Sequence, residues 1–359
     1  MKAAVCRAFN EDLSLESVDL APPQTGEVQV RLAACAICHS DIAYMDGSWG
    51  GALPAVFGHE AAGIVETVGE DVPEFAPGDH VVVTLVRSCG TCRCCSRRSF
   101  SICEADFPLN HRSPLTDASG APLVHGLGTA AFAEAVVVDA SQLVAIPREL
   151  PFDRAALLAC GVITGYGAVA NTAKIEPGSD VVVIGAGGVG LNAIQGAALC
   201  GAGRIVAVDI ADAKLDDAIE FGATDAVNSS KEDASDAVSR LTGGRGADYV
   251  FISVGAKAAF DAAYAMLARG GAAVIVGMPA DGVMSQFEPG DFAAGSKRIL
   301  GSKMGSSNIR KDIPQLADLY RQSRLKLDEL ISGRYGLADI NEAIASVKRG
   351  EARRNVIVF

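Results

Sequence analysis

The 359-residue sequence lacks the features that would place a chain in a membrane or outside the cell. It has no run of about 18 apolar residues, the length that a membrane-spanning helix requires. Its opening residues, MKAAVCRAFNEDL, lack the apolar stretch of a secretory signal. No tract is of low complexity, and 49% hydrophobic with 21% charged residues is a globular composition. We therefore expect a cytoplasmic protein without a membrane partner, whose ten cysteines are thiols or metal ligands rather than disulfides.

Basic residues are scarce relative to acidic ones. The chain has 31 Lys and Arg against 43 Asp and Glu, a net charge of -12. Such a balance opposes binding to phosphate backbones or anionic headgroups, which need clustered positive charge. The one dense basic stretch, residues 93–98, is interrupted by cysteines and is typical of the solvated rim of a metal loop. The composition therefore predicts no nucleic-acid partner.

The length and the hydrophobic pattern predict two domains of an α/β protein, because 359 residues exceed what one hydrophobic core supports. Residues 1–161 carry alternating apolar positions such as Val28, Val30 and Leu32, which indicate a mostly β unit. Residues 162–303 follow a rhythm of strand, glycine turn, helix and strand, which favours a doubly wound parallel sheet. Residues 304–359 show two helical stretches and a final apolar strand. We assign this tail to the first domain.

A glycine-rich turn follows the apolar strand expected at residues 180–184. Glycines with the G-x-G-x-x-G spacing permit a tight turn, and the following helix N-terminus favours a pyrophosphate. An acidic residue at the end of the next strand would accept hydrogen bonds from ribose hydroxyls and repel a 2′-phosphate, which favours NAD over NADP. Glycines that only make a turn remain the alternative. The predicted cofactor residues are Gly185, Gly187, Gly188, Val189, Gly190, Asp209 and, on the next helix, Lys214.

Four cysteines, Cys89, Cys92, Cys95 and Cys103, lie within one loop. Four thiolates at this spacing can surround a tetrahedral Zn²⁺ and leave no position for a substrate, so the pattern predicts a structural zinc. Cys94 is a fifth thiol in the loop, and on spacing we expect it not to be a ligand. An iron–sulfur cluster or redox-active thiols are the competing interpretations.

Three further segments carry metal-ligand residue types. They are Cys38-His39-Ser40-Asp41, Gly58-His59-Glu60 and Cys160-Gly161. None is diagnostic alone. In this order and spacing, together with the four-cysteine loop and residues 185–190, they make the whole chain resemble the zinc-containing alcohol dehydrogenases of the medium-chain dehydrogenase/reductase (MDR) superfamily. The resemblance implies a GroES-like catalytic domain, a Rossmann coenzyme domain, two zinc ions per chain and NAD.

The resemblance also implies roles for individual residues. Cys38, His59 and Cys160 would hold a catalytic zinc, the Cys₂His donor set known from alcohol dehydrogenases, with one position open to substrate oxygen. Among the residues around these ligands, Asp41 would orient His59, and Glu60 would lie near the zinc. Ser40 would accept the substrate proton. His39 and Arg354 would contact the pyrophosphate. The sequence has Ala43 where many members have a histidine that passes the proton to solvent, so we expect slower proton release near neutral pH.

The substrate is expected to be a primary or secondary alcohol, oxidised to an aldehyde or ketone by hydride transfer. Trp49, Leu85 and Phe107 are candidate pocket walls, and bulky walls favour a hydrophobic or aromatic alcohol. The long segment 104–129 resembles that of dimeric members, so we expect a homodimer, with a tetramer as the alternative. A thiol-adduct formaldehyde dehydrogenase or a polyol dehydrogenase on the same fold is one rival. A non-catalytic zinc scaffold or redox sensor is another.

Overall fold

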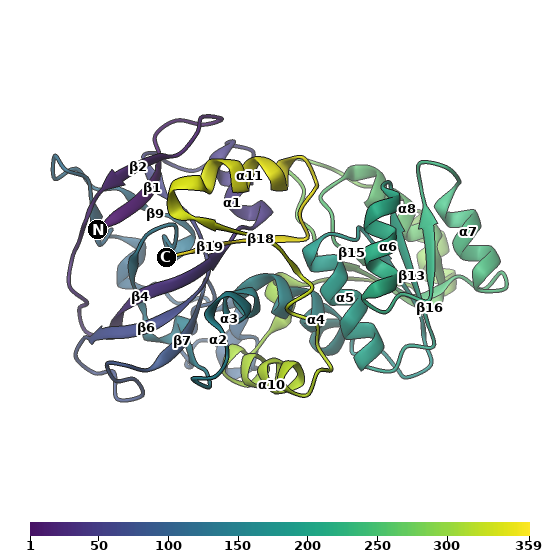
Figure 1. Cartoon of the computed structure of the whole chain (residues 1–359). Helices are drawn as coiled ribbons and strands as arrows, with labels where there is room; N and C mark the ends of the chain where they lie inside the picture. Colours follow the sequence, from purple (N-terminus) through teal and green to yellow (C-terminus); the bar gives the residue numbers. More distant parts are fainter. The chain divides into compact units, whose positions relative to one another are not determined.

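The computed structural model describes residues 1–359 and divides them into two compact units. One unit contains Met1–Cys160 together with Asn308–Phe359, and the other contains Gly161–Ser307. Figure 1 shows the elements of both units along the chain. The chain is α/β, as the sequence pattern predicts.

The first unit is built on two larger β-sheets and one short pair, β3 (Asp19–Leu20) with β8 (Leu115–Thr116). The larger sheet has the order β11 (Leu143–Ala145), β7 (His80–Thr84), β6 (Glu60–Val68), β4 (Glu27–Ala36), β19 (Arg354–Val358) and β18 (Ile331–Gly336), and β10 (Ala135–Asp139) also pairs with β4. The smaller sheet has the order β2 (Ser14–Ser17), β1 (Lys2–Cys6), β5 (Ala55–Val56) and β9 (Val124–His125). Along β4, Val28, Val30 and Leu32 are buried while Arg31 is exposed. The predicted alternation therefore marks a strand with one face on the core.

The C-terminal segment belongs to this first unit. It contains α10 (Ile309–Arg321) and α11 (Ile340–Lys348), and its last strand, β19, pairs antiparallel with β4 with Val356 opposite Ala36. Ile357 is fully buried in the same core as Val28 and Val30. The tail thus completes the larger sheet.

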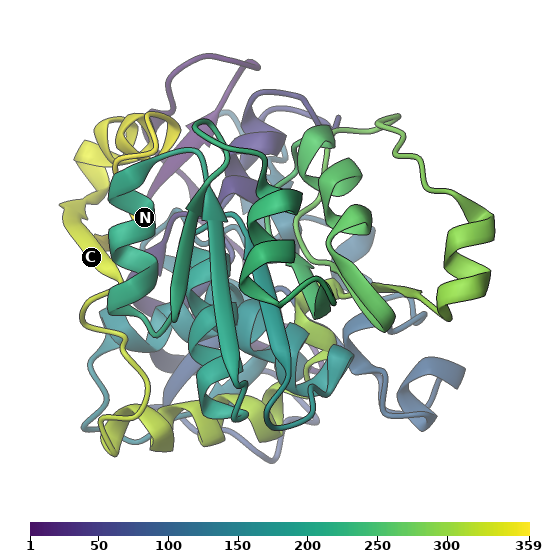
Figure 2. The same cartoon turned by 90° about the vertical axis from the view of Figure 1, so that its right-hand side faces the viewer.

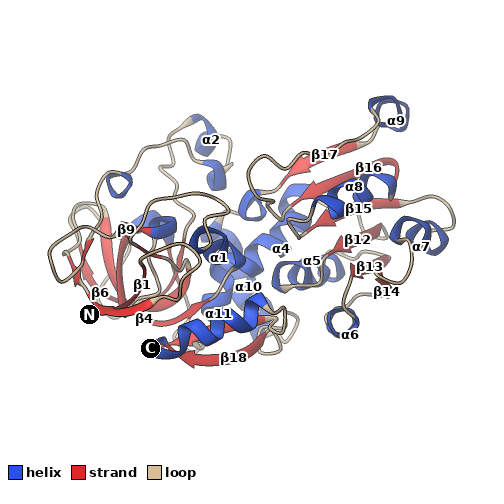
Figure 3. Ribbon diagram, turned by 90° about the horizontal axis from the view of Figure 1, so that it is seen from above, coloured by secondary structure: helices blue, strands red, loops and turns tan.

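The second unit is a six-stranded parallel sheet flanked by helices (Figures 2 and 3). Its strand order is β14 (Asp225–Asn228), β13 (Arg204–Asp209), β12 (Asp180–Ile184), β15 (Ala247–Ile252), β16 (Leu267–Ile275) and β17 (Arg298–Gly301). The helices are α5 (Gly188–Leu199), α6 (Asp212–Glu220), α7 (Ala234–Leu241), α8 (Lys257–Ala265) and α9 (Pro289–Gly295). The pattern predicts a helix as far as Arg269, but α8 ends at Ala265, because Leu267 already pairs with Ala247 of β15.

One helical segment, Phe152–Ala173, is long and apolar enough to cross a bilayer by length and composition. It consists of α3 (Phe152–Leu157), α4 (Ile163–Gly167) and two π-helical stretches, residues 158–162 and 168–173. Of its most apolar window, 83% is buried within the protein. The segment is therefore accounted for as a core helix, and its apolar character follows from that burial.

Candidate active site and structural metal centre

Strand register brings distant segments of the first unit to one end of the larger sheet. Ala36 pairs with Glu60, Glu60 pairs with Thr84, and Val356 pairs with Ala36. Figure 1 shows β4, β6 and β7 running side by side. Cys38 follows the end of β4, and His59 immediately precedes β6, so both lie at this end of the sheet.

Asp41 ties two of these segments together. Helix α1 (His39–Met45) begins after Cys38, and Asp41 in its first turn accepts the N–H of Cys38 at 3.2 Å, which completes a capping box. The other carboxylate oxygen accepts the N–H of Gly58 at 2.9 Å and lies 2.9 Å from Nδ1 of His59. Asp41 is fully buried. The expected hydrogen bond between Asp41 and His59 is therefore present, and it leaves Nε2 as the free ligand atom of the ring.

Four buried side chains converge at this place: Cys38, His59, Glu60 and Cys160. One ligand atom from each lies within 4.8 Å of all the others. Nε2 of His59 is buried and has no hydrogen-bond partner, an arrangement that a protein rarely leaves unsatisfied. Two thiols, an imidazole and a nearby carboxylate are the donors that zinc prefers. The residues therefore fit a zinc ion, and Cys160 reaches the cluster from a π-helical turn.

The cluster perturbs the acidity of its own members. A hydrogen bond with Cys160 holds the pKa of Cys38 well below its ordinary value, against the effect of burial. The same bond and burial raise the pKa of Cys160 well above its ordinary value. Burial acts to lower the pKa of His59, but the charge and hydrogen bond of Asp41 outweigh it and the pKa lies well above its ordinary value. Cys38 is therefore the sulfur that ionises first.

Glu60 and Arg354 form a buried ion pair. Nη2 of Arg354 lies 2.7 and 2.8 Å from the two carboxylate oxygens, and Nη1 donates to the carbonyl of Ile37 at 3.2 Å. Burial raises the pKa of Glu60 to about 7, while the charge of Arg354 acts in the opposite direction. Nη2 of Arg354 contacts both oxygens, a charge-assisted arrangement that favours the ionised carboxylate. Contact of Arg354 with a pyrophosphate stays a prediction, because both terminal nitrogens have partners within the protein.

The remaining predicted residues of α1 lie around the cluster. The N–H of Ser40 points to Sγ of Cys38 at 3.5 Å, and Ser40 is half-buried. His39 is exposed, and Ala43 is half-buried. The structure therefore holds Ser40 next to a candidate ligand, whereas the roles of Ser40 in proton transfer and of His39 in cofactor binding stay predictions.

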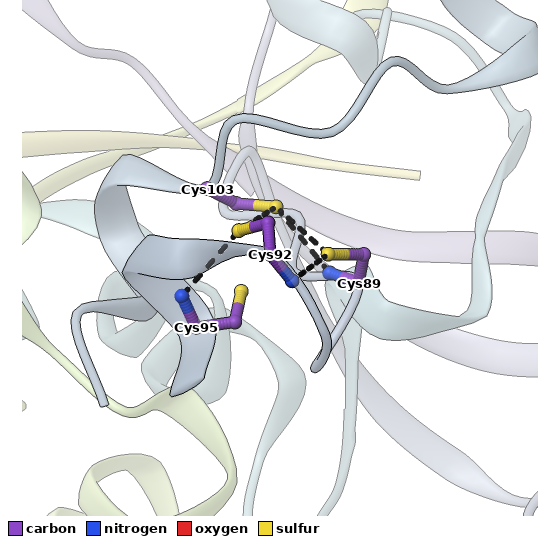
Figure 4. Close-up of side chains that lie close together, drawn as sticks. All are labelled: Cys89, Cys92, Cys95 and Cys103. Atoms are coloured by element: carbon purple, nitrogen blue, oxygen red, sulfur yellow. Dashed lines mark hydrogen bonds between the residues drawn. The ribbon is translucent and has the colours of Figure 1, made fainter. Parts of the chain in front are cut away.

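The four cysteines of the loop form a second cluster, shown in Figure 4. Their sulfurs lie within 4.8 Å of one another, and α2 (Arg93–Ser96) carries Cys95 inward. Backbone N–H groups point at the sulfurs: that of Cys92 at Cys89 (3.3 Å), that of Cys95 at Cys92 (3.4 Å) and that of Cys89 at Cys103 (3.4 Å). These donors stabilise thiolates, and the N–H of Cys92 in particular lowers the pKa of Cys89 to about 6.

The cluster consists of the four predicted cysteines and does not include Cys94. Desolvation raises the pKa of Cys94, and it raises that of Cys95 to about 12. Four cysteine sulfurs within 4.8 Å of one another, with backbone donors around them, suit a closed zinc site. The residues therefore fit a structural zinc.

The glycine motif lies where β12 turns into α5. Gly185 has a φ of +92°, and a Cβ on Gly190 would lie 1.8 Å from the carbonyl oxygen of Gly185. By contrast, a Cβ on Gly187 would meet nothing within 4 Å. The turn is therefore tightly packed behind Gly185 and Gly190, with open space at Gly187. An N-terminal helix end with such a space fits a dinucleotide pyrophosphate.

Asp209, at the end of β13, is buried and holds this turn. Its carboxylate accepts the N–H of Ala186 at 2.8 Å, of Ile210 at 2.8 Å and of Ala211 at 3.1 Å. These bonds give Asp209 a structural role that sequence reasoning did not assign. Lys214 is half-buried on α6. Ribose contacts of Asp209 and Lys214 stay predictions.

The candidate pocket walls have packing partners of their own. Trp49 packs edge-on against Tyr44 with ring centroids 5.4 Å apart, and Leu85 is half-buried. The guanidinium of Arg87 lies 5.1 Å from the ring centroid of Phe107. Sequence reasoning missed Arg87, whose only local signal is its position between Leu85 and the first cysteine of the loop.

Comparisons with known families match both units of the chain. Residues 24–148 match the family described as alcohol dehydrogenase GroES-like domain, and residues 188–322 match zinc-binding dehydrogenase. "Alcohol dehydrogenase-like 7" of Arabidopsis thaliana is 37% identical over 99% of this chain and 94% of its own length. "Alcohol dehydrogenase class-3" of Zea mays is 37% identical, with 100% and 96% covered. "Probable S-(hydroxymethyl)glutathione dehydrogenase 1" of Schizosaccharomyces pombe is 37% identical, with 99% and 96% covered.

Solved structures give the same result. An alcohol dehydrogenase zinc-binding domain protein from Burkholderia ambifaria has a TM-score of 0.95 at 36% identity, covering 100% of this chain and 98% of that one. Benzyl alcohol dehydrogenase from Acinetobacter calcoaceticus has a TM-score of 0.93 at 33% identity, covering 100% and 99%. The chain also contains two candidate metal clusters. Together with similarity at this level over the full length, they show that the chain belongs to the zinc-dependent alcohol dehydrogenases of the medium-chain dehydrogenase/reductase superfamily and is an NAD-dependent enzyme.

Proposed function

We propose that this enzyme interconverts hydrophobic or aromatic primary or secondary alcohols with their aldehydes or ketones, using Cys38, His59 and Cys160 as ligands of a catalytic zinc. The observation that carries the proposal is the convergence of these three buried side chains around an unpartnered Nε2 of His59. When bound, zinc supplies polarisation of the substrate oxygen, and NAD supplies the hydride acceptor. The four cysteines of the loop are proposed to hold a second, structural zinc.

The chain's own groups orient these ligands and move the proton. Asp41 holds Nδ1 of His59 and the N–H of Cys38, so two ligand residues are oriented by one carboxylate. The hydroxyl of Ser40 can accept the proton of the substrate alcohol and donate its own outward. Glu60, neutralised by Arg354, keeps a carboxylate beside the ligands without adding net charge. Because Ala43 offers no further base, proton release depends on solvent or the cofactor ribose.

We infer that Asp209 favours NAD over NADP, because a 2′-phosphate would meet its negative charge. His39, Lys214 and Arg354 are the proposed additional cofactor contacts. A solved relative from Sinorhizobium meliloti, 26% identical with a TM-score of 0.83, is bound to NADP. Asp209→Asn removes the charge and keeps one of the two acceptor oxygens, so either the bond to the N–H of Ala186 or those to Ile210 and Ala211 remain. It is expected to lower the ratio of kcat/KM for NAD over NADP by about tenfold, and an unchanged ratio would contradict the assignment.

The test of the substrate class is a panel of alcohols followed by NADH absorbance. Benzyl alcohol and medium-chain alcohols are expected to give kcat/KM at least about tenfold above ethanol and above a polyol, since Trp49 and Leu85 are apolar. A similarity to a benzyl alcohol dehydrogenase supports this choice. Equal kcat/KM for benzyl alcohol and a polyol would refute the apolar pocket and favour the polyol alternative.

One observation favours a second candidate, the oxidation of a thiol adduct that carries carboxylates. Nη1 of Arg87 is buried without a hydrogen-bond partner beside Phe107, a predicted wall residue, and a guanidinium N–H of this kind can donate to a carboxylate. Relatives named S-(hydroxymethyl)glutathione dehydrogenase and class-3 alcohol dehydrogenase are as similar as any reported above. This candidate would be established if the wild type has a higher kcat/KM for S-(hydroxymethyl)glutathione than for benzyl alcohol and Arg87→Gln loses this preference.

Zinc content separates the enzyme from a non-catalytic scaffold or redox sensor. Two zinc ions per chain, one of them removed by chelation together with activity, are expected of the enzyme. One zinc and no NAD binding would leave only the scaffold. We also propose that the protein is a cytoplasmic homodimer, and sedimentation of the purified chain tests the dimer. The proposed domain limits are 1–161 with 304–359 for the catalytic domain and 162–303 for the coenzyme domain.

A further inference from the structure

The backbone carbonyl that precedes each proposed zinc ligand accepts a hydrogen bond from a buried side chain. Thr84 donates its hydroxyl to the carbonyl of Ala159, before Cys160, at 2.6 Å. Thr129 donates to the carbonyl of Gly58, before His59, at 2.7 Å. The third carbonyl, that of Ile37 before Cys38, accepts from Arg354, as described above. The two threonines are fully buried.

A single amide joins the two threonines. Nε2 of Gln142 donates to the carbonyl of Thr84 at 2.8 Å and to the carbonyl of Gly128, next to Thr129, at 2.9 Å. Its Oε1 accepts the N–H of Asp139 at 3.3 Å, which fixes which end of the amide faces the two carbonyls. Gln142 is fully buried. The network therefore runs without interruption from the peptide before His59 to the peptide before Cys160.

A peptide unit is rigid and planar, so its carbonyl oxygen and the next Cα atom move together. A hydrogen bond at the oxygen before a ligand residue therefore restrains the plane from which the ligand side chain projects. Breaking such a bond leaves a buried carbonyl without a partner, which the surrounding peptide relieves by turning. Small rotations of this kind displace Sγ or Nε2 at the end of the side chain.

We propose that Thr84, Thr129 and Gln142 form a positioning network that sets the distance between the ligand atoms of His59 and Cys160. This inference rests on the proposed function, because it takes both residues as ligands of one zinc. The three residues do not touch the metal or the substrate. They act through the two peptides, and groups that act in this way alter metal affinity by about 10–100-fold in other metal sites.

The experiment uses the full-length enzyme with both zinc ions. The variants are Thr84→Val, Thr129→Val and Gln142→Met, which keep side-chain volume and remove the hydrogen bonds, and Thr84→Ser and Thr129→Ser, which retain a hydroxyl. The matched control is Thr242→Val in the second unit, where a buried threonine hydroxyl donates to the carbonyl of Val238 at 2.8 Å. Zinc release to a chromophoric chelator is followed as two phases, one for each site. The visible absorption of enzyme with Co²⁺ in the catalytic site reports ligand geometry.

The Thr84→Val and Thr129→Val variants are expected to speed release of the catalytic zinc by about tenfold or more, leave the structural zinc unaffected and shift the cobalt absorption. The serine variants should restore both quantities, and the control should match wild type. If Thr84→Val has the same zinc-release rate and cobalt spectrum as Thr242→Val, the inference is overturned, while the proposed function stands. A Cys160→Ser variant that still holds two zinc ions would instead overturn the proposed ligand set. If a valine variant does not fold, Thr84→Ala against Thr84→Ser makes the same comparison.

Discussion

Asp41 is the residue on which the geometry of the proposed catalytic site depends most. Its two oxygens accept from Cys38, Gly58 and His59. Asn in its place keeps the shape but offers one acceptor and two N–H donors, so at least one of these bonds becomes a repulsive contact. We expect Asp41→Asn to weaken binding of the catalytic zinc by about 10–100-fold and to lower kcat accordingly. Competition with a chelator of known affinity measures the first effect.

The control for this prediction lies on the same helix. Asp46 ends α1, and its carboxylate accepts the N–H of Ser48 at 2.8 Å on the exposed side. Asp46→Asn removes the same charge without touching the ligands, and its zinc affinity should equal that of the wild type. Equal affinity in Asp41→Asn as well would mean that the carboxylate does not orient the site.

At the scale of elements, the four-cysteine loop offers a comparison between adjacent residues. Cys95 belongs to the sulfur cluster, whereas Cys94 does not. We expect Cys95→Ser to lose the structural zinc and to expose segment 89–103 to proteolysis, because the metal supplies most of the loop's stability. Cys94→Ser should keep two zinc ions and resist cleavage as the wild type does. Zinc analysis and limited proteolysis check both variants, and the reverse result would show that Cys94 is the ligand.

The turn between β12 and α5 offers a second comparison. A Cβ at Gly187 meets no neighbour, and its φ is -78°, so Gly187→Ala should fold normally but obstruct the pyrophosphate. We expect the Kd for NADH to rise at least about tenfold, or ~1.4 kcal/mol, with an unchanged melting temperature. Gly190→Ala instead collides with the carbonyl of Gly185. Because overpacking costs about 1–3 kcal/mol, this variant should melt several degrees lower. NADH fluorescence titration and thermal melts distinguish the two, and normal NADH binding by Gly187→Ala would contradict the predicted site.

Local motifs were readable from spacing alone, whereas long-range partnerships were not: the grouping of Cys38, His59 and Cys160 and the bond of Asp41 to His59 were expected only from the family resemblance. The cysteine loop and the glycine turn each lie within a short segment, so spacing alone predicts which residues meet. The partners of Glu60, Thr84 and Asp209 depend on which strands lie side by side and in what register, and a single sequence does not reveal either. For the same reason the pattern did not identify Gln142, a polar residue that appears unremarkable until β7 and β11 are paired.

At the scale of the whole molecule, the two kinds of cofactor chemistry belong to different units. Both cysteine-containing clusters consist of residues of the first unit, and the glycine turn with Asp209 belongs to the second. Chelation is therefore expected to remove activity while the second unit still binds NADH. This separation makes zinc content and dinucleotide binding independent measurements of the same enzyme.

The acid stability of the whole fold should depend on one half-buried histidine, whose two ring nitrogens are shielded from solvent. Burial lowers the pKa of His125 from 6.5 to about 4, assisted by the nearby charges of Arg87 and Arg112. Between pH 4 and 6.5, the histidine is therefore protonated in the unfolded chain but neutral in the folded chain. The free energy of unfolding is therefore unaffected by this group above pH 6.5 and decreases as the pH falls from 6.5 to 4. The decrease is roughly 3 kcal/mol, at about 1.4 kcal/mol per pKa unit.

His125→Leu removes the titrating group from this position, so its stability should fall less between pH 6.5 and 4 than that of the wild type. Protonation of the zinc ligands also destabilises the protein in acid, but it does so equally in both chains, and the difference between them isolates the histidine. Urea unfolding at a series of pH values measures this difference. The exposed His111 serves as the comparison, since its pair with Asp106 is open to solvent and its replacement by Asn should change the pH dependence much less than His125→Leu does. A wild-type pH dependence in His125→Leu would mean that this ring is not what limits stability in acid.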